Sequence, residues 1–538
     1  MSEENIFSGG KRQLPTSQVN TGVELLEALK KRDKNFIIFE DVETGETITV
    51  GELIENACQL SKRLTDFIGK SGNIIAVASE NNVNYFTVVL AALFSGVPVA
   101  LLDPNYTIYE LRTILSITKP ALVFCSLKQI PKYTKVLVTY RSIRKLVVID
   151  SKDDGKQFDS LRTFTERSTT ISNFTIKDVN IKKETAFILF SSGTTGLPKG
   201  VMLSHFSINT TMVMAGDPTI KSPTKADITL GLLPIYHVYG LFVVIMSILE
   251  DRKVVLLKKF EPQLFLKTIQ NYKITRLAVV PPLVQFLLNN PLIEKYDLSS
   301  LQEIGSGASM LPEKSRTEAI KKFNLKYFRV GYGLTESGLS VSSMPYNTPR
   351  PGSVGKLYPG ISAVIKDLRT GKNLPPYSQG EICIKADSVM QGYYGNPQAT
   401  KNSFTKDGWL KTGDLGYFDE DGYLYIVDRL KEVIKYKGFQ IAPAELEAIL
   451  LTHPKIQDAG VVGKPDDKAG ELPTAFVIKK SGAKLTENEV KFYVAGFVKR
   501  EKHLHGGVIF LDELPRMSSG KLKRKDLKAL LNNPKSKL

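Results

Sequence analysis

Apolar residues along the chain alternate between short continuous runs and stretches with helical spacing. Runs rich in β-branched residues predict strands, and they lie at 73–78, 121–125, 145–148 and 186–190. Apolar residues three or four positions apart predict helices at 21–31 and 51–67. Because strands that alternate with helices build parallel sheets covered by helices, this pattern predicts an α/β fold with mainly parallel sheets.

The pattern changes in the last third of the chain. Short apolar runs at 361–366, 381–385 and 423–426 are separated by Gly and Asp turns and predict a small β-rich subdomain. After Asp428-Arg429-Leu430-Lys431 a new order begins, with helices expected at 444–451 and 487–499 and strands at 458–462 and 474–479. We therefore expect a large N-terminal domain, 1–430, and a small mobile α+β domain, 431–538, joined at 430–431.

Composition narrows the class of protein without naming a function. Of 538 residues, 42% are hydrophobic and 24% charged, which excludes wholesale disorder, collagen and a coiled-coil rod. Lys and Arg number 72 against 55 Asp and Glu, a formal net charge of +17. Residues 431–538 alone hold 21 basic and 13 acidic residues. This surplus suits anionic ligands, and the absence of a helix-turn-helix pattern or zinc spacing argues against nucleic acid.

Targeting signals point to one compartment. No apolar stretch reaches the roughly 20 residues of a membrane span, so we expect no transmembrane segment. Cys58, Cys125 and Cys383 lie far apart, so we expect isolated reduced thiols rather than disulfides or a zinc site. The final Ser536-Lys537-Leu538 matches a peroxisomal address, which predicts recognition by a peroxisomal import receptor and location in the peroxisome.

The most informative segment is a loop rich in Gly, Ser and Thr after the strand predicted at 186–190. It reads Ser191-Ser192-Gly193-Thr194-Thr195-Gly196-Leu197-Pro198-Lys199-Gly200. Glycines expose backbone amides, hydroxyls donate to phosphate oxygens, and Lys199 adds positive charge. The order differs from a Walker A loop because Lys199 precedes Gly200. Taken alone, the same composition also fits a polar turn between a strand and the next element.

The loop resembles the signature of the adenylate-forming superfamily, which comprises acyl-CoA synthetases, peptide-synthetase adenylation domains and beetle luciferases. Further segments occur in that family's order: Tyr332-Gly333-Leu334-Thr335-Glu336, Thr412-Gly413-Asp414, Asp428-Arg429-Leu430-Lys431, Lys435-Tyr436-Lys437-Gly438-Phe439-Gln440 and Ser519-Gly520-Lys521. The chain is most similar to the branch of luciferase-like insect acyl-CoA synthetases, with coumarate ligases beside it. The resemblance implies an acid–thiol ligase that uses ATP, Mg²⁺ and CoA and proceeds through an acyl-adenylate.

The resemblance also implies residue roles. Catalysis falls to Lys521, His237 and Lys435, and the hinge to Lys431. ATP would contact Ser191, Ser192, Gly193, Thr194, Thr195, Gly196, Lys199, Gly307, Ala308, Gly331, Tyr332, Gly333, Thr335, Asp414 and Arg429. Mg²⁺ would be held by Glu336 and Thr335, and CoA by Lys435, Lys437, Gly438 and Gln440. The acid would lie against His237, Val238, Tyr239, Ser306, Leu334 and Leu339.

These roles suit the chemistry of the side chains. A long cationic Lys521 can reach both the acid's carboxylate and the α-phosphate of ATP. The carboxylate of Asp414 can accept both ribose hydroxyls, and Mg²⁺ prefers oxygen ligands together with phosphates. We expect the neighbours Lys523, Arg524 and Lys525 to form a solvated basic face.

Three positions depart from the luciferase pattern and bear on the substrate. Val238 replaces a glycine, Gly216 an arginine, and Leu339 a small hydroxyl residue. Apolar Val238 and Leu339 suit an alkyl chain, so a fatty acyl-CoA ligase is the leading hypothesis. A 4-coumarate-type arylpropanoid-CoA ligase and a luciferase that oxidises a luciferyl adenylate remain alternatives. A pseudoenzyme is disfavoured because Lys199, Glu336, Asp414, Arg429, Lys435 and Lys521 are all present.

Overall fold

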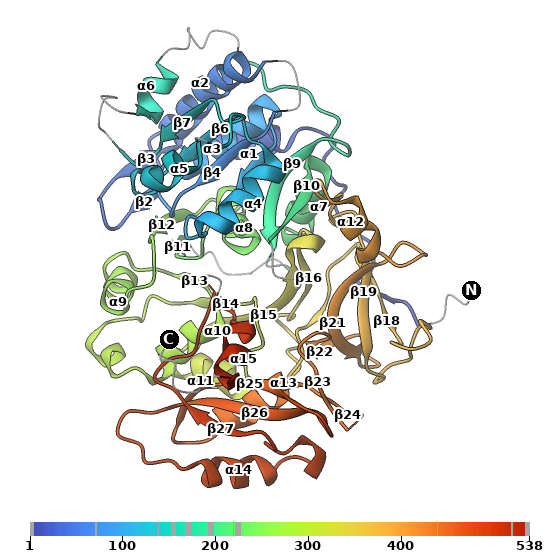
Figure 1. The fold of residues 1–538 in the computed structure, drawn as a ribbon. Coiled ribbons are helices and arrows are strands. Elements are labelled where there is room, and N and C mark those ends of the chain that lie inside the picture. Colours follow the sequence, from blue (N-terminus) through green and yellow to red (C-terminus); the bar gives the residue numbers. More distant parts are fainter. Residues whose placement is uncertain are drawn as a thin grey trace.

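The computed structural model describes residues 5–69, 73–137, 139–151, 158–166, 174–191, 198–218, 220, 227–437, 439–517 and 520–532. Figure 1 shows a large N-terminal part built on three sheets and a small C-terminal part beneath it. The predicted α/β class is confirmed, including the small β-rich subdomain. The boundary between the domains at 430–431 stays a prediction.

The first sheet has eight strands in the described part of the chain. Its order is β20 (Gly392–Tyr393), β10 (Lys199–Ser204), β9 (Thr185–Ser191), β5 (Val99–Leu101), β4 (Ile75–Ala78), β6 (Leu122–Cys125), β7 (Lys145–Val148) and β8 (Asp159–Ser160). The strands from β9 to β8 run parallel, whereas β10 pairs antiparallel with β9 and with β20. The four strands predicted in this region are all present.

The second sheet has nine strands among the described residues. Its order is β17 (Lys356–Leu357), β16 (Leu339–Ser343), β15 (Tyr327–Leu334), β14 (Glu303–Ser306), β13 (Arg276–Val279), β11 (Ile228–Gly231), β12 (Lys253–Leu256), β2 (Ile37–Asp41) and β3 (Thr47–Thr49). The central strands from β15 to β2 are parallel. Their carboxyl ends therefore meet at one edge, where ligands of such sheets bind.

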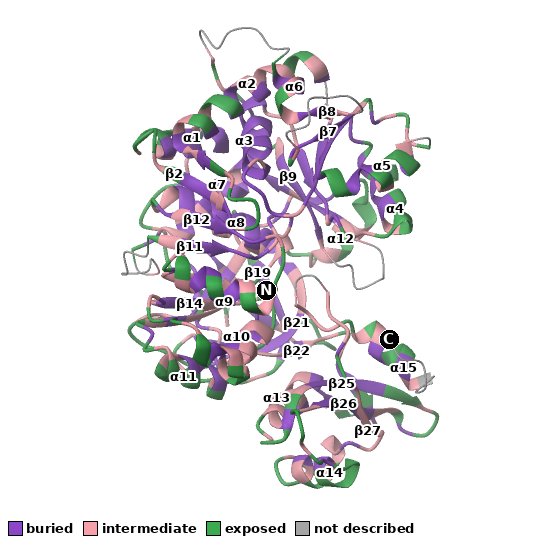
Figure 2. Cartoon of the chain, turned by 90° about the vertical axis from the view of Figure 1, so that its left-hand side faces the viewer, coloured by how far each residue is buried: buried purple, intermediate pink, exposed green. Residues whose placement is uncertain are grey.

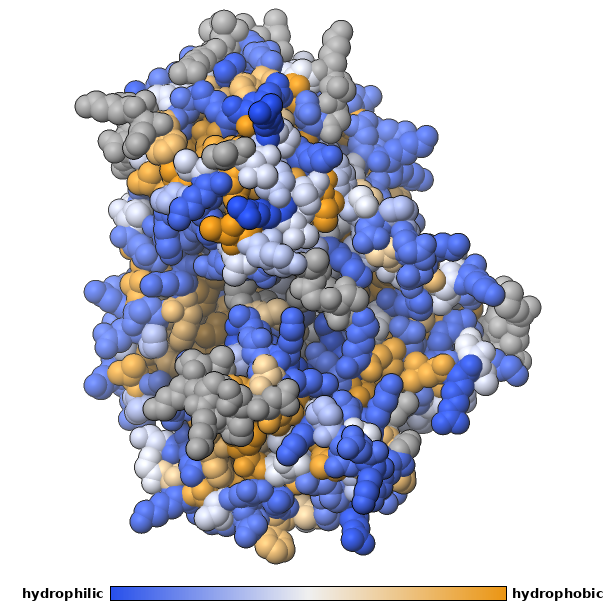
Figure 3. Space-filling model, in the orientation of Figure 1, coloured by the Kyte–Doolittle hydropathy of each residue, from blue (hydrophilic) through white to orange (hydrophobic). Residues whose placement is uncertain are grey.

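Helices fill the space between these two sheets. α1 (Thr21–Lys30), α2 (Val50–Ile68), α3 (Tyr85–Ser95) and α8 (Val238–Leu249) contribute to one apolar core together with strands of both sheets. α3 is buried along its whole length, and Figure 2 shows α3 and α8 in the interior. On the face in Figure 3, hydrophilic residues predominate and apolar ones lie in small groups. Among the described residues, no helix combines the length and apolar character needed to cross a bilayer.

The outer faces of the two sheets carry their own helices. α4 (Ile108–Thr118) and α5 (Ile130–Leu137) cover the first sheet. α9 (Pro262–Asn271), α10 (Pro281–Asn289) and α11 (Glu313–Lys322) cover the second. The third sheet is antiparallel and joins β1 (Phe7–Ser8), β18 (Ser362–Lys366), β19 (Gly380–Lys385), β21 (Leu410–Phe418) and β22 (Leu424–Arg429).

The C-terminal part is a separate sheet with helices on both faces. The strands are ordered β24 (Phe439–Ile441), β23 (Ile434–Tyr436), β26 (Gly470–Lys479) and β25 (Ile456–Asp466), with β27 (Gly507–Phe510) beside β26. α13 (Pro443–Leu451) and α14 (Glu487–Ala495) pack on one face, and α15 (Arg524–Asn532) on the other. α14 ends four residues before the predicted limit, with Gly496 at its C-cap.

The cysteines are buried and free, as the sequence predicts. Burial raises the pKa of Cys58 to about 11 and that of Cys125 to about 12, which keeps both thiols protonated.

Candidate active site

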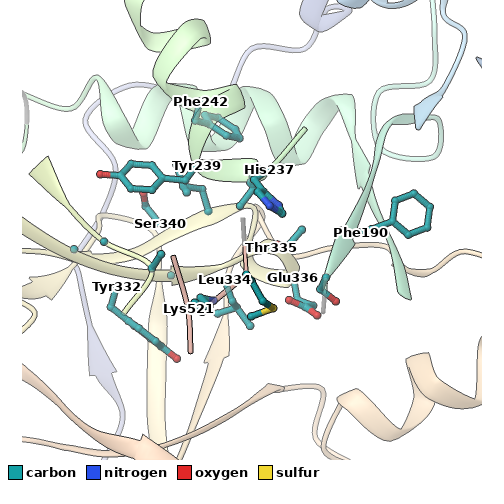
Figure 4. Close-up of a pocket in the computed structure, with 18 of the residues that line it drawn as sticks. Phe190, His237, Tyr239, Phe242, Tyr332, Leu334, Thr335, Glu336, Ser340 and Lys521 are labelled. Carbon is teal, nitrogen blue, oxygen red and sulfur yellow. The ribbon is translucent and has the colours of Figure 1, made fainter. Parts of the chain in front are cut away.

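A cavity of about 1450 Å³ lies at the carboxyl edge of the second sheet, between α8 and the C-terminal part. The sequence-predicted residues that line it are Ser191, Lys199, His237, Val238, Tyr239, Ser306, Gly307, Ala308, Gly331, Tyr332, Gly333, Leu334, Thr335, Glu336, Leu339, Arg429, Lys431 and Lys521. Figure 4 shows Lys521 beside Leu334, with Tyr332, Thr335 and Glu336 on the strand and turn around it. Segments far apart in the sequence therefore meet at one site.

The predicted phosphate loop begins at this cavity. Ser191 ends β9 and Lys199 begins β10, and the two residues pair across the strands. Lys199 Nζ lies 4.9 Å from the centre of the Tyr393 ring. The predicted ATP contacts Ser192, Gly193, Thr194, Thr195 and Gly196 lie outside the described residues.

Tyr393 connects the loop lysine to the predicted metal ligand. Its hydroxyl donates to Glu336 Oε1 over 2.9 Å, while its ring faces Lys199. Burial and the nearby Glu336 raise the pKa of Tyr393, so the phenol keeps its proton and acts as a donor. No local sequence pattern predicts a role for Tyr393, because its contact with Glu336 joins residues 57 positions apart.

The predicted ribose-binding carboxylate lies just behind the cavity wall. Asp414 is buried on β21 and accepts a hydrogen bond from the Tyr332 hydroxyl over 2.7 Å. Arg429 Nε lies 3.3 Å from Asp414 Oδ1. Burial raises the pKa of Asp414, whereas Arg429 and the Tyr332 hydroxyl oppose that rise. Tyr332 thus orients the carboxylate as well as lining the cavity.

The floor of the cavity is nearly free of side chains. Gly305 and Gly307 lie on and after β14, and the Tyr239 hydroxyl donates to the Gly305 carbonyl over 3.2 Å. Ala308 has a φ of +72°, a backbone conformation that residues other than glycine seldom adopt. The Ser306 Oγ is buried and has no hydrogen-bond partner among the described residues. The small residues leave a flat surface, which suits a planar ring such as adenine.

His237 stands at the N-terminus of α8, facing the cavity (Figure 4). Burial lowers its pKa to about 4; Asp103 opposes this change and Lys521 adds to it. The imidazole is therefore neutral near pH 7, and a neutral ring can accept as well as donate a proton. Asp103 also lines the cavity and was not predicted from the sequence.

Lys521 reaches the cavity from a tight turn between β27 and α15. Arg516 holds this turn by donating to the Gly520 carbonyl over 2.8 Å and to Asp458 Oδ2 on β25 over 2.7 Å. Gly520 has a φ of +78°, and a Cβ there would lie 2.8 Å from Val280 Cγ2 of the N-terminal part. Only a glycine allows the two parts to approach this closely.

The environment of Lys521 disfavours its charged form. Burial and Arg429 lower its pKa to about 8, although Asp414 and Glu336 act in the opposite direction. An anionic ligand placed beside this amine would restore its proton. The side chain is therefore suited to stabilise negative charge that arrives with ATP and the acid.

The described side chains of the predicted CoA-facing segment, those of residues 435–437 and Phe439, do not line the cavity. Lys435 is exposed on β23, and its backbone amide donates to Glu471 Oε2 over 3.0 Å. Lys437 is also exposed, at the tip of the hairpin between β23 and β24, with a φ of +47°. Gly438 and the side chain of Gln440 lie outside the described residues. In this arrangement the structure brings Lys521, but not Lys435, to the predicted ATP residues.

The predicted hinge lies between these two segments. Lys431 lines the cavity, and burial together with nearby Lys199 lowers its pKa. Just before it, Asp428 Oδ2 accepts a hydrogen bond from the backbone amide of Ala444, at the start of α13, over 2.8 Å. The side chain of Asp428 thus connects the third sheet to the C-terminal part.

One expectation about the basic run after Lys521 is wrong. Lys523 and Lys525 are exposed, as predicted, but the Arg524 side chain is largely buried. Its guanidinium donates to Glu432 Oε2 over 2.6 Å, to Glu447 Oε2 over 3.0 Å and to the Val461 carbonyl over 3.0 Å. Three acceptors from separate segments thus surround the Arg524 guanidinium. Its burial could not be predicted from the residues next to it in the sequence.

The predicted acid pocket is apolar near the reacting groups. Val238 and Phe242 of α8 line the cavity together with Leu334 and Leu339. Leu339 has a φ of +106°, a strained conformation for a branched side chain. Gly216 ends α7 (His205–Ala215) beside Ala215, and of these two residues Ala215 lines the cavity.

The donor groups near Glu336 fit the predicted Mg²⁺ only in combination with a nucleotide. One carboxylate and the Thr335 hydroxyl supply oxygen ligands, and Mg²⁺ bound through phosphates needs few protein ligands. No cluster of three or more His, Cys, Asp or Glu side chains that could hold a metal by itself is found in the described ranges.

Comparison with known proteins agrees with this geometry. The family described as "AMP-binding enzyme" matches residues 26–394, and "AMP-binding enzyme C-terminal domain" matches residues 445–521. Because the first match covers more than half of the chain, the protein belongs to the family of AMP-binding, adenylate-forming enzymes.

Individual relatives fall into two activities. The chain is 41% identical to luciferin 4-monooxygenase of Nipponoluciola cruciata, over 100% of this chain and 99% of that protein. It is 39% identical to a probable 4-coumarate–CoA ligase of Dictyostelium discoideum, over 90% of each chain. The crystal structure of ATP-bound MatB from Rhodopseudomonas palustris is 28% identical and covers 96% of this chain and 100% of its own, with a TM-score of 0.85. The chain is thus similar to luciferases and CoA ligases alike.

Proposed function

We propose that this protein is an ATP-dependent carboxylic acid–CoA ligase that joins its substrates in two steps. In the first step the acid attacks the α-phosphate of ATP, giving an acyl-adenylate and pyrophosphate. In the second step the CoA thiol displaces AMP. The observation that supports this proposal is the meeting of Lys521 with Arg429, Tyr332 and buried Asp414 at one end of a cavity whose adjoining walls are apolar.

The residues of this chain have separate tasks in the first step. Lys199 and the loop after Ser191 would hold the β- and γ-phosphates, and Asp414 would bind the ribose. Mg²⁺ would bind Glu336, Thr335 and the phosphates, and it would neutralise part of their charge. Lys521 would lie between the carboxylate and the α-phosphate, where charge develops in the transition state.

The second step requires a different group of residues. We infer that the C-terminal part turns about Lys431, so that the hairpin with Lys435 and Lys437 replaces the turn with Lys521. Gly438 and Gln440 would then border the path of the CoA arm. His237, at the mouth between the acid and CoA sites, would assist as a neutral imidazole.

A fatty acid is the first choice of substrate because Val238, Phe242 and Leu339 give the pocket apolar walls. The 41% identity to a luciferin 4-monooxygenase favours light emission as a second candidate, and the 39% identity to a coumarate ligase favours an arylpropanoid acid as a third. Val238 and Leu339 both depart from the luciferase pattern and argue for the alkyl substrate.

One screen separates these candidates. The purified protein is incubated with ATP, Mg²⁺, CoA and either fatty, cinnamic or luciferin-type acids, and pyrophosphate, acyl-CoA and light are read together. We expect pyrophosphate and acyl-CoA from fatty acids without light. Leu339→Ser should shift the substrate preference away from alkyl acids. An unchanged substrate preference would show that Leu339 does not contribute to substrate selection. Light from luciferin without acyl-CoA from any acid would favour the luciferase.

We also propose import into peroxisomes through Ser536-Lys537-Leu538, which lies outside the described residues. A fluorescent protein fused to the N-terminus should accumulate in peroxisomes, and deletion of these residues should leave it in the cytosol. Equal distribution of both fusions would contradict the proposal.

A further inference from the structure

The cavity has a second, charged end to which no role has been assigned. Its lining there includes the charged side chains Glu250, Arg252, Arg276, Glu303 and Arg329. Arg276 and Glu303 begin β13 and β14, whereas the proposed ATP site lies at the opposite, carboxyl ends of these strands. The lining also follows α8 from Val238 past Met246 to Glu250, a length of about 18 Å. A long narrow acid could therefore extend from Lys521 to these charges.

Strand alternation explains why the charges face the cavity. In β14, Ile304 belongs to the core beneath α9–α11, so its neighbours Glu303 and Gly305 point to the side of α8. Phe328 and Val330 of β15 belong to that same core, which places Arg329 on the cavity side. On this face of the sheet, small residues such as Gly305 therefore lie near the proposed ATP site. The charged residues Glu303 and Arg329 lie on the same face, nearer the amino ends of the strands.

The charged side chains contact one another closely. Arg276 Nη2 donates to Glu303 Oε2 over 2.5 Å, and its Nη1 lies 3.4 Å from Glu250 Oε2. Arg252 also contacts Glu250. Arg329 Nε lies 3.8 Å from Glu303 Oε1, too far for a hydrogen bond, whereas its Nη2 donates to the Ile220 carbonyl over 3.1 Å.

The balance of these five side chains is positive. Three arginines meet two glutamates, which leaves one excess cation at a site where side chains are at most 20% exposed. Burial, followed by Arg276, lowers the pKa of Arg252 to about 9; Glu303 and the exposed Asp227 act in the opposite direction. Asp227 is exposed and lies outside the cavity lining, so an anion inside the cavity would stabilise these buried guanidinium groups further.

We propose that the preferred acid carries a second carboxylate at its far end, which the arginines at the charged end of the cavity bind. This inference rests on the proposed ligase function and narrows its substrate from a simple fatty acid to a dicarboxylic acid. One carboxylate would be activated beside Lys521, and the other would neutralise the excess charge near Arg276, Arg252 and Arg329. The apolar walls between them would hold the methylene chain.

Matched pairs of acids test this proposal. Hexanoic and adipic acid, decanoic and sebacic acid, and dodecanoic and dodecanedioic acid are compared by kcat/KM for pyrophosphate release with ATP and Mg²⁺. Hydrogen bonds to charged groups predict that the dicarboxylic member of at least one pair is preferred by about tenfold or more. Preference for the monocarboxylic member in every pair would overturn the proposal.

Two substitutions that change the net charge of the five side chains in opposite directions test the same proposal. Arg276→Met lowers the net charge of the five side chains by one, so the preference should fall by about tenfold. Glu303→Gln raises it by one, so the preference should rise. The control Lys273→Met removes a cation from the exposed Lys273–Asp297 pair near the same strand and should not change the preference.

The results also separate this proposal from the proposed function. If cinnamic or other acids form acyl-CoA but no dicarboxylic acid is preferred, the ligase function stands and the dicarboxylate inference fails. If no acid releases pyrophosphate, the ligase function itself fails. Thermal unfolding of each variant identifies a misfolded one; if Arg276→Met does not fold, an unchanged preference in Glu303→Gln alone contradicts the proposal.

Discussion

The two lysine-bearing segments of the C-terminal part differ sharply in their surroundings. The turn with Lys521 is attached to β25 through Arg516 and Asp458 and reaches into the cavity. The hairpin with Lys435 includes β23, separated from β25 by β26, and the Lys435 side chain is exposed. The C-terminal part thus presents Lys435 from a strand and Lys521 from a turn, and its present orientation places Lys521 at the predicted ATP residues. The comparison indicates an arrangement suited to adenylation; under the proposed function, the C-terminal part would reorient before the thioester step.

The largest effect should come from Lys521→Ala. Loss of a cation aimed at the reacting groups should slow acyl-adenylate formation by about 100-fold or more. Thioester synthesis from a preformed acyl-adenylate should continue at the normal rate. Pyrophosphate release measures the first step, and conversion of synthetic adenylate with CoA measures the second.

The exposed Lys484, which lies in the C-terminal part but outside the cavity lining, provides the control for this variant. Lys484→Ala should leave both steps unchanged. If Lys521→Ala forms the acyl-adenylate at nearly the normal rate, Lys521 does not assist adenylation. The two segments would then not differ in the step that they serve.

The lowered pKa of Lys521 predicts a dependence on pH. Because burial and Arg429 bring this pKa down to about 8, the protonated amine of the free enzyme is lost as pH rises through that value. The kcat/KM for adenylation should then fall about tenfold for each further pH unit. In Lys521→Arg the fall should disappear, since a guanidinium stays protonated. A flat wild-type profile up to pH 10 would contradict the requirement for a protonated Lys521.

Gly520→Ala should weaken the first step selectively. The added methyl group would meet Val280, only 2.8 Å from its position, and would push the turn with Lys521 away from the cavity. We expect adenylation to fall by about tenfold, as for other small displacements of reacting groups. The second step should remain normal. Gly482→Ala is the matched control, because its φ is +73° but nothing lies within 4 Å. Equal losses in both variants would attribute the effect to backbone strain alone.

The smallest effect should come from Lys435→Ala. Adenylation should be unchanged because Lys435 lies outside the cavity, whereas thioester formation should fall by several-fold to about tenfold through loss of a charged contact. Lys464→Ala, at an exposed position of the same sheet, provides the control. A defect in adenylation would show that the two segments do not divide the steps between them.

The sequence predicted much of the fold because local patterns determine it. Amphipathic spacing located α2, and buried β-branched runs located β4, β6 and β7 within one or two residues. The predicted ATP residues of known placement, apart from Asp414, line one cavity. These positions were found because glycines, hydroxyls and charges of a known motif lie together along the chain.

Other parts of the site depend on contacts between distant segments. Tyr393, Asp103 and the buried ion pairs of Arg524 carried no local signal, since each depends on the packing of separate strands. The same holds for Arg276, Glu303 and Arg329. In the sequence, each is an ordinary charged residue in the first half of a strand. Only the parallel order β13–β14–β15 places the three side chains on one face.

The contacts on either side of Lys431 limit where the C-terminal part can pivot. Glu432 is attached to Arg524 of α15, so it must travel with that part as a single body. Asp428 continues β22 and must remain with the third sheet, releasing the amide of Ala444 when the parts separate. Arg429 pairs with Asp414 in the third sheet, so a swivel between the two states would be confined to the dihedral angles of residues 430–431. With so short an axis, the proposed reorientation would be a rotation about a nearly fixed point, with little freedom for the two parts to slide past each other.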